Sequence, residues 1–149
     1  MIWKPNVTVA AIIEQSGKFL MVEEHSANGP VNNQPAGHLE PDEGLQDAAI
    51  RETLEETGYQ FTPCAFIGSY LWHNEENQTT YYRTTFSGTV CDQHIETQLD
   101  DGIIRALWMS RDDILANQHR LRSPIIIESI DDFLAGKTYP LDIVKTNIK

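Results

Sequence analysis

The spacing of hydrophobic and polar positions predicts that the chain opens with a β-hairpin. Residues 7–13 are apolar and β-branched, which is typical of a buried strand. A Ser-Gly turn signal follows, and residues 18–24 are expected to form the antiparallel partner. Residues 25–33 contain an Asn-Gly-Pro breaker, so we expect a loop there.

The strongest helix signal covers residues 45–57, with Gly58 where a C′ glycine belongs. After it come four stretches rich in apolar, aromatic or β-branched residues, which predict strands. Two shorter helices are also expected, the first with Ser110 as its N-terminal cap. The strands are expected at 59–62, 65–73, 80–90 and 103–109, and the two helices at 110–117 and 124–134. This order predicts an α/β domain with helices packed on a mostly antiparallel or mixed sheet.

The helix at 45–57 has two chemically different faces. At about 100° per residue, Glu52, Glu55 and Glu56 fall within an arc of about 100°. The positions expected to pack on the core lie on the opposite side and are Ile50, Thr53, Leu54 and Thr57. The helix is therefore expected to bury one side and to present three carboxylates on the other.

Two interpretations of this acidic face are open. A solvated surface is the simpler one, because glutamate is a good helix former. However, like charges three or four residues apart each cost roughly 0.2–0.5 kcal/mol, and only Arg51 borders the arc. Glu55 and Glu56 also lie in the last turn, where the helix dipole disfavours negative charge. Converging carboxylates are ligands for Mg²⁺ or Mn²⁺, so a cation site is the second interpretation.

The segment before the helix adds to the candidate site. Residues 34–38 form a tight loop in which Gly37 lets the backbone approach a ligand closely. Glu43 stands at the helix entrance, and Arg51 is placed to pair with Glu43 or with Asp47. Pairing with Glu43 would hold a ligand glutamate in place, whereas pairing with Asp47 would be a surface ion pair of little energetic worth.

Length and charge narrow the class of protein. The 149 residues suit a single domain, 1–149, and no stretch approaches the eighteen or so apolar residues of a membrane span. The first residues lack a signal-peptide pattern, so we expect a cytoplasmic protein, and a monomer. The net charge of -11 disfavours nucleic-acid binding. A phosphate-bearing substrate would also be repelled, so a divalent metal would have to mediate its binding.

The spacing of these residues resembles the signature of a known family. Gly37 is followed after five residues by Glu43, and after seven more by the run Arg-Glu-Thr-Leu-Glu-Glu-Thr-Gly-Tyr that begins at Arg51. This pattern is similar to the Nudix box, and every charged and glycine position of the box is present. Thr53 and Tyr59 replace aliphatic residues, which leaves the chemistry unchanged.

The resemblance implies an α/β/α sandwich with a mixed β-sheet, in which the box forms a loop–helix–loop catalytic motif. It also implies hydrolysis of compounds that link a diphosphate to another group, with Mg²⁺, or Mn²⁺ as an alternative, as cofactor. The implied metal ligands are Glu52, Glu55, Glu56 and the carbonyl of Gly37, with Arg51 and Glu43 orienting them. The general base stays open between Glu52, Glu56 and an acid outside the box, for which Asp100 and Asp101 are candidates.

The flanking segments, including Asn33-Gln34 and the Leu-Arg-Ser-Pro run that contains Arg122, resemble a bacterial phosphatase branch of the family. That resemblance implies release of phosphate from hydroxymethylpyrimidine pyrophosphate, thiamine pyrophosphate, and nucleoside di- and triphosphates. Two enzymatic alternatives are a nucleoside triphosphate pyrophosphatase and a nucleotide-sugar or dinucleotide pyrophosphatase. A non-enzymatic nucleotide sensor is a further alternative, which the complete box disfavours.

Several aromatic and cationic residues are candidate substrate contacts. Aromatic side chains on the predicted strands can stack on a ring, but neighbours such as Tyr81 and Tyr82 cannot both face one pocket. Arginines suit phosphate, especially just before a helix, where the N-terminus also favours anions. The candidate substrate contacts are Gln34, Trp72, Tyr82, Arg83, Asp101 and Arg122.

Overall fold

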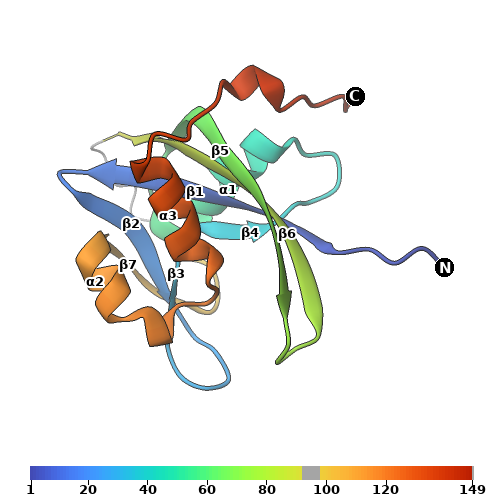
Figure 1. Ribbon diagram of the computed structural model, residues 1–149. Helices are drawn as coiled ribbons and strands as arrows, with labels where there is room; N and C mark the ends of the chain where they lie inside the picture. The colour runs from blue at the N-terminus through green and yellow to red at the C-terminus, as the bar shows by residue number, and fades with distance from the viewer. Residues whose placement is uncertain (92–97, 149) are drawn as a thin grey trace.

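A computed structural model describes residues 1–91 and 98–148 of the chain (Figure 1). The strands are β1 (Asn6–Gln15), β2 (Lys18–Glu24), β3 (Val31–Asn33), β4 (Ala36–His38), β5 (Phe61–Asn74), β6 (Thr79–Val90) and β7 (Ile103–Ser110). The α-helices are α1 (Leu45–Thr57), α2 (Arg111–Ala116) and α3 (Ile125–Leu134), and 3₁₀ turns lie at Gln118–Arg120 and Leu141–Ile143. None of the helices in these ranges is long and apolar enough to cross a membrane.

The sheet is mixed, as the sequence predicts. Its main part has the order β4-β1-β6-β5, in which β1 and β6 run parallel and the other neighbours run antiparallel. The second part is antiparallel, with β2 between β3 and β7. The predicted hairpin of β1 and β2 joins the two parts.

Helices cover both faces of this sheet, which confirms the predicted sandwich. Alternate residues of β1 point to opposite sides: Val9, Ala11 and Ile13 pack in the core with α1, whereas Ile12 packs in the core with α2 and α3. Figure 1 shows α3 in front of the sheet and α1 behind it. Because both faces are covered, β1 is apolar along its central stretch rather than alternating.

Helix α1 ends at the predicted residue, but the face that it buries differs from the prediction. Gly58 has a left-handed φ of 78° and donates its N–H to the Leu54 carbonyl. Thr53 and Thr57 are buried as expected, while Ile50 and Leu54 are only partly buried. Glu52 and Glu56, expected on an open face, are buried as well. The reason is that β4 covers this side of α1, so that both faces of the helix are enclosed.

The strand boundaries correct three other expectations. The two strands predicted at 59–62 and 65–73 form one continuous strand, β5, whose register shifts near Pro63 and Phe66. Pro63, which lies between the two predicted strands, is accommodated at one of these irregularities in the pairing with β6. The predicted loop at 25–33 ends in β3, because the chain turns back to pair with β2, and the loop at 34–38 contains β4, because that segment pairs with β1.

Candidate active site

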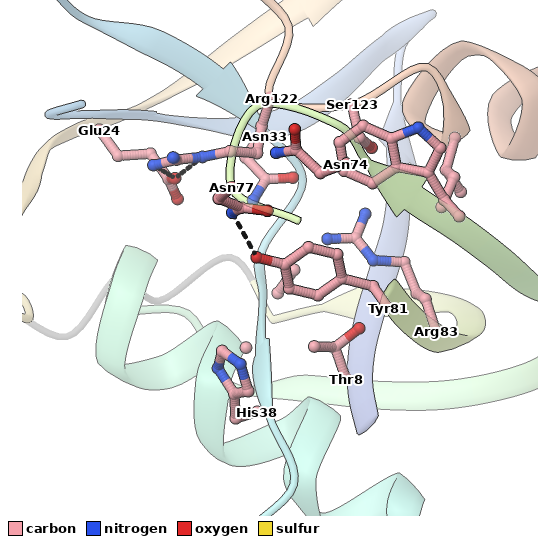
Figure 2. Close-up of a pocket in the computed structure, with 14 residues that line it drawn as sticks. Thr8, Glu24, Asn33, His38, Asn74, Asn77, Tyr81, Arg83, Arg122 and Ser123 are labelled. Carbon is pink, nitrogen blue, oxygen red and sulfur yellow. Dashed lines mark hydrogen bonds and ion pairs between the residues drawn. The ribbon is translucent and has the colours of Figure 1, made fainter. Parts of the chain in front are cut away.

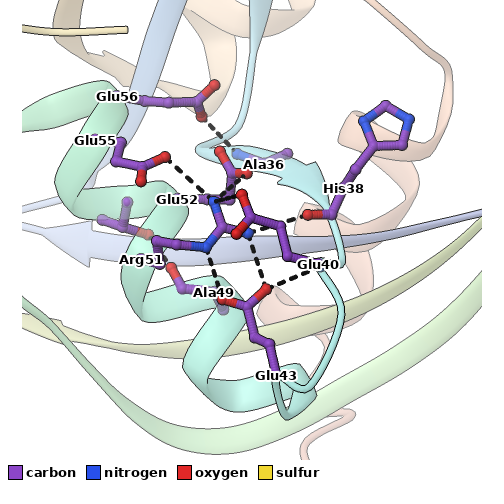
Figure 3. Close-up of polar contacts among 10 residues, drawn as sticks. Ala36, His38, Glu40, Glu43, Ala49, Arg51, Glu52, Glu55 and Glu56 are labelled. Carbon is purple, nitrogen blue, oxygen red and sulfur yellow. Dashed lines mark hydrogen bonds and ion pairs between the residues drawn. The ribbon is translucent and has the colours of Figure 1, made fainter.

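Arg51 is the centre of a network that joins the start of α1 to its last turns (Figure 3). Its guanidinium donates from Nε and Nη2 to the two carboxylate oxygens of Glu43, at 2.6 and 2.9 Å. Nη1 donates to Glu52 at 2.8 Å and to Glu55 at 3.2 Å, and Nη2 donates to the carbonyl of His38 at 3.1 Å. Of the two partners that the sequence left open, the structure therefore selects Glu43.

The bidentate pair fixes the charge state of both partners. The Arg51 hydrogen bonds hold the pKa of the Glu43 carboxyl below its usual value, and the same bonds raise the pKa of Arg51. Glu43 also accepts the backbone N–H of Glu40, at 3.0 Å. Both side chains are partly shielded from water, so this is a stronger restraint than an exposed surface ion pair.

Three acidic side chains converge beside this network. Glu52, Glu55 and Asp100 each place a carboxylate oxygen within 4.8 Å of the other two. Asp100 is positioned by its backbone N–H, which donates to the Glu55 carbonyl at 3.0 Å. Asp101, the other candidate acid from this segment, is exposed and does not belong to the cluster within the described ranges. The chain turns after Asp100, so the earlier of the two acids faces α1.

Glu56 lies deeper than the other carboxylates of the box. Its side chain accepts the backbone N–H of Ala36 at 2.8 Å, which ties α1 to β4. Burial raises the pKa of Glu56 to about 9, and the negative charges of Glu24 and Glu52 act in the same direction. Burial also raises the pKa of Glu52 and of Glu55. Without a cation, these acids therefore hold protons more tightly than acids in water do.

Gly37 allows Glu52 to lie directly against β4. A Cβ atom at this position would lie 2.2 Å from the Glu52 carboxyl carbon and 2.3 and 2.4 Å from its oxygens. Only glycine leaves this space free. The sequence prediction that Gly37 permits a close backbone approach therefore has a specific partner, the carboxylate of Glu52.

The donor set fits a hard divalent cation. The oxygens of the Glu52, Glu55 and Asp100 cluster lie within 4.8 Å of one another, while oxygens on one Mg²⁺ ion lie about 3–4 Å apart. Small side-chain rotations would bring them to that spacing. Burial is the largest cause of the raised pKa of Glu52 and of Glu55, and the negative charge of Asp100 acts in the same direction. A bound cation would relieve this repulsion.

A cleft of about 270 Å³ opens on the other side of β4 (Figure 2). Its walls come from β1, β4, the β5–β6 hairpin and the segment before α3. The lining residues are Thr8, Glu24, Asn33, Ala36, Gly37, His38, Trp72, Asn74, Asn77, Tyr81, Arg83, Arg122, Ser123 and Ile125. Ala36 and Gly37 thus contact the cleft and also the carboxylates of Glu56 and Glu52.

Arg83 is a buried cation in this cleft. It is 8% exposed, and within the described residues its hydrogen-bond partner is the neutral amide of Gln34, at 3.3 Å from Nη1. Burial lowers the pKa of Arg83 to about 10, although the charges of Glu24 and Glu56 oppose the shift. Gln34 does not line the cleft; it is buried and donates to Ser129 of α3 at 2.9 Å. Gln34 therefore orients Arg83 from behind.

Arg122 also lines the cleft, but its charge is already paired. Nε and Nη2 both donate to one carboxylate oxygen of Glu24, the first at 2.8 Å. Nη2 also donates to the carbonyl of His25 at 3.4 Å. Because Glu24 neutralises Arg122, Arg83 is the stronger attraction for an anion in this cleft.

The aromatic wall consists of Trp72 and Tyr81, not of Trp72 and Tyr82. The rings of Trp72 and Tyr81 are stacked with centroids 5.8 Å apart and an interplanar angle of 20°. Tyr82 is 41% exposed, points to the other face of the sheet and does not line this cleft, so its role as a substrate contact stays an untested prediction. Alternation along β6 showed that only one tyrosine could face the cleft, but the choice depended on which side α3 covers.

Some lining residues had no signal in the sequence. The main examples are Thr8 and Ser123, short polar residues in otherwise apolar or loop-like segments. Thr8 is paired with Arg83 across β1 and β6 and with His38 across β1 and β4. Only this strand register could have identified it.

Comparison with known proteins agrees with this geometry. A model of the NUDIX domain matches residues 3–130. The chain belongs to the Nudix family. It is 41% identical over 143 residues to "Phosphatase NudJ" of Escherichia coli K12, a match that covers 95% of this chain and 92% of that protein. NudJ of Shigella flexneri matches equally well. The protein is therefore a hydrolase that acts on small-molecule phosphate anhydrides.

Solved structures show the same fold. A Nudix hydrolase from Nitrosomonas europaea is 50% identical, with a TM-score of 0.93, and the match covers 97% of this chain and 98% of that one. A MutT protein from Methanosarcina mazei has a TM-score of 0.73 at 23% identity, covering 92% of this chain and 99% of that one, and supports the fold alone. Nudix enzymes generally use divalent metal ions, which agrees with the carboxylate cluster.

Proposed function

We propose that the protein is a Mg²⁺-dependent phosphatase that removes the terminal phosphate from small diphosphate compounds of an aromatic heterocycle. Hydroxymethylpyrimidine pyrophosphate and thiamine pyrophosphate are the leading candidates, and nucleoside di- and triphosphates are further ones. Mn²⁺ is the alternative metal. The similarity to NudJ, which is named as a phosphatase, supports release of phosphate rather than pyrophosphate.

The observation that carries the proposal is that carboxylates and a buried arginine lie on either side of β4. Ala36 and Gly37 contact Glu56 and Glu52 on one side and line the cleft with Arg83 on the other. An anion bound beside Ala36 and Gly37 would have a cation on each side. One is Arg83 in the cleft, and the other is the metal ion held by the carboxylates. Such an arrangement holds the phosphates of an anhydride and stabilises the charge that develops on them.

The residues of the site have different roles in this proposal. Glu52, Glu55 and Glu56, with the carbonyl of Gly37, hold the metal; Asp100 joins them, because it shares their cluster. Arg51 and Glu43 fix the orientation of the carboxylates. When bound, the metal supplies positive charge at the phosphate oxygens and lowers the pKa of the attacking water. Of the two candidate acids outside the box, Asp100 rather than Asp101 competes with Glu52 and Glu56 for the role of general base.

The size and lining of the cleft support a small substrate. Its volume of about 270 Å³ lies near the lower limit of small-ligand sites. It offers one aromatic wall, from Trp72 and Tyr81, together with amide groups, and this suits the stacking of a heterocyclic ring. The paired Arg122 and Glu24 close one side of the same cleft and restrict its width.

The test of the catalytic assignment is Glu56→Gln, which keeps the oxygen that accepts the Ala36 N–H but removes the charge. Phosphate release from thiamine pyrophosphate at saturating Mg²⁺ should fall by roughly two orders of magnitude or more. Glu75→Gln, an exposed acid in the β5–β6 turn, is the matched control and should keep wild-type turnover. If Glu56→Gln keeps wild-type turnover, the assignment of the box as the catalytic centre fails.

The product distinguishes the phosphatase from its enzymatic alternatives. Wild-type protein is incubated separately with ATP and with thiamine pyrophosphate, and orthophosphate is measured against pyrophosphate. We expect orthophosphate from both. Pyrophosphate as the sole inorganic product would instead establish a nucleoside triphosphate pyrophosphatase. Absence of any product, with retained ligand binding, would indicate a sensor.

A further inference from the structure

Three buried hydroxyl groups have no hydrogen-bond partner among the described residues: those of Thr8, Thr85 and Ser123. A buried hydroxyl without a partner lowers the stability of the folded state, because its hydrogen bonds to water are lost on folding and are not replaced. Two of the three, Thr8 and Ser123, line the cleft, although they are only 5% and 6% exposed. The third, Thr85, is fully buried and does not line the cleft.

Thr8 lies at the end of the cleft that holds Arg83, a cation with no carboxylate partner in an ion pair among residues 1–91 and 98–148. It pairs in register with Arg83 on β6 and with His38 on β4, so the three residues form one row across the sheet. Figure 2 shows Thr8 and His38 together on one side of the cleft. The next residue on β4, Gly37, lies against the Glu52 carboxylate, so this row is adjacent to the row that meets that carboxylate.

Ser123 lies at the opposite side, where the charges are already paired. It follows Arg122, which is neutralised by Glu24, and it precedes Pro124 and α3. In Figure 2 its side chain lies on the same side of the cleft as those of Asn33 and Asn74. A hydroxyl with neutral amides nearby suits the polar edge of a ring, since each group can donate or accept a hydrogen bond.

We propose that Thr8 and Ser123 are substrate contacts whose hydrogen bonds are completed by the substrate: Thr8 with Arg83 at a phosphate oxygen, and Ser123 at a polar atom of the heterocycle. This rests on the proposed function, and it narrows the substrate class. The organic group contains a heteroaromatic ring that carries a hydrogen-bonding atom on its edge. A purely apolar group would leave Ser123 buried and unsatisfied and would be rejected for that reason.

Three matched variants test whether the hydroxyls of Thr8 and Ser123 contact the substrate. Thr8→Val and Ser123→Ala each remove one hydroxyl from the cleft, and Thr85→Val makes the same change away from it. All three should have melting temperatures equal to or above that of the wild type, because each loses an unpartnered polar group. The variants therefore remain folded, and any change in ligand affinity reports on the cleft.

Binding is measured by calorimetry with Mg²⁺ present, using probes without a cleavable anhydride. Thiamine monophosphate and cytidine monophosphate carry a ring, and methylenediphosphonate carries none. We expect Ser123→Ala to weaken the ring-bearing probes by roughly three- to tenfold and to leave methylenediphosphonate within about twofold. Thr8→Val should weaken all three probes by a similar factor. Thr85→Val should bind each probe as the wild type does.

Either of two results would overturn the inference. One is that Thr8→Val and Ser123→Ala bind every probe as tightly as Thr85→Val does, in which case the hydroxyls are merely tolerated. The other is that neither ring-bearing probe binds the wild type. Failure of the proposed function would look different from both results. In that case the wild-type protein would still bind these probes but would release no phosphate from thiamine pyrophosphate.

Discussion

Replacing Gly37 by alanine should remove most of the activity while leaving the fold intact. The new Cβ would lie 2.2 Å from the Glu52 carboxyl carbon, whereas carbon atoms in contact are about 3.5–4.0 Å apart. The Glu52 carboxylate must therefore move by about 1 Å or more. It is held by Arg51 at 2.8 Å, so the movement disturbs the network that positions the cluster.

The size of the expected loss of activity follows from this displacement of the Glu52 carboxylate. A misplacement of about 1 Å at a catalytic group reduces the rate by on the order of 100-fold, equivalent to ~2.7 kcal/mol. The free energy of unfolding should change much less, because φ of Gly37 is not left-handed and the obstructing atoms end a side chain. We expect kcat for thiamine pyrophosphate to fall about 100-fold, with a melting temperature close to that of the wild type.

Gly17→Ala is the matched control. Gly17 has a φ of 77°, and its added Cβ would have open space around it. This variant should lose roughly 1–2 kcal/mol of stability through backbone strain and keep its turnover. The reasoning would be refuted if Gly37→Ala kept kcat within about threefold of the wild type with unchanged Mg²⁺ dependence, because Glu52 would then tolerate the displacement.

Two further predictions concern the buried polar groups. In metal-free protein, the pKa of Glu56 is raised to about 9, so the folded state retains a proton that the unfolded state loses above its ordinary pKa near 4.5. The free energy of unfolding should therefore fall as pH rises from about 4.5 to 9, by up to about 1 kcal/mol per pH unit. Denaturation in chelator should show a shallower slope for Glu56→Gln, and an equal slope would contradict the prediction. Gln34→Leu should raise KM roughly tenfold with a smaller effect on kcat, because Arg83 loses its oriented partner. Steady-state kinetics tests this, and an unchanged KM would show that Arg83 needs no such support.

Features that depend on neighbours along the chain were predictable. The helix at 45–57 and its glycine cap follow from periodicity and from the special conformation of Gly58, and both are confirmed. The N-terminal cap at Ser110 is also confirmed, since its side chain accepts the N–H of Asp113, and the structure adds that the Ser110 N–H donates to the Asp113 carboxylate. The fixed spacing of Gly37, Glu43 and the helix glutamates was sufficient to assign the family, because that spacing lies within one loop–helix segment.

The assignment of faces depended on contacts between distant segments. Periodicity placed Glu52 and Glu56 on one side of α1, but only β4, which is brought there by pairing with β1, makes that side buried and raises the pKa of Glu56. Likewise, the choice of Tyr81 over Tyr82 required knowing which face of β6 forms the cleft.

The sequence by itself therefore determined the elements, the family and the carboxylate motif, because each is encoded over a few turns or one strand. The tertiary structure decided which groups share the site: Asp100 rather than Asp101, Gln34 as a support for Arg83, and Thr8 as its neighbour. The physical reason is that burial, electrostatic shifts and strand register arise between segments far apart in the chain, and no local pattern specifies them.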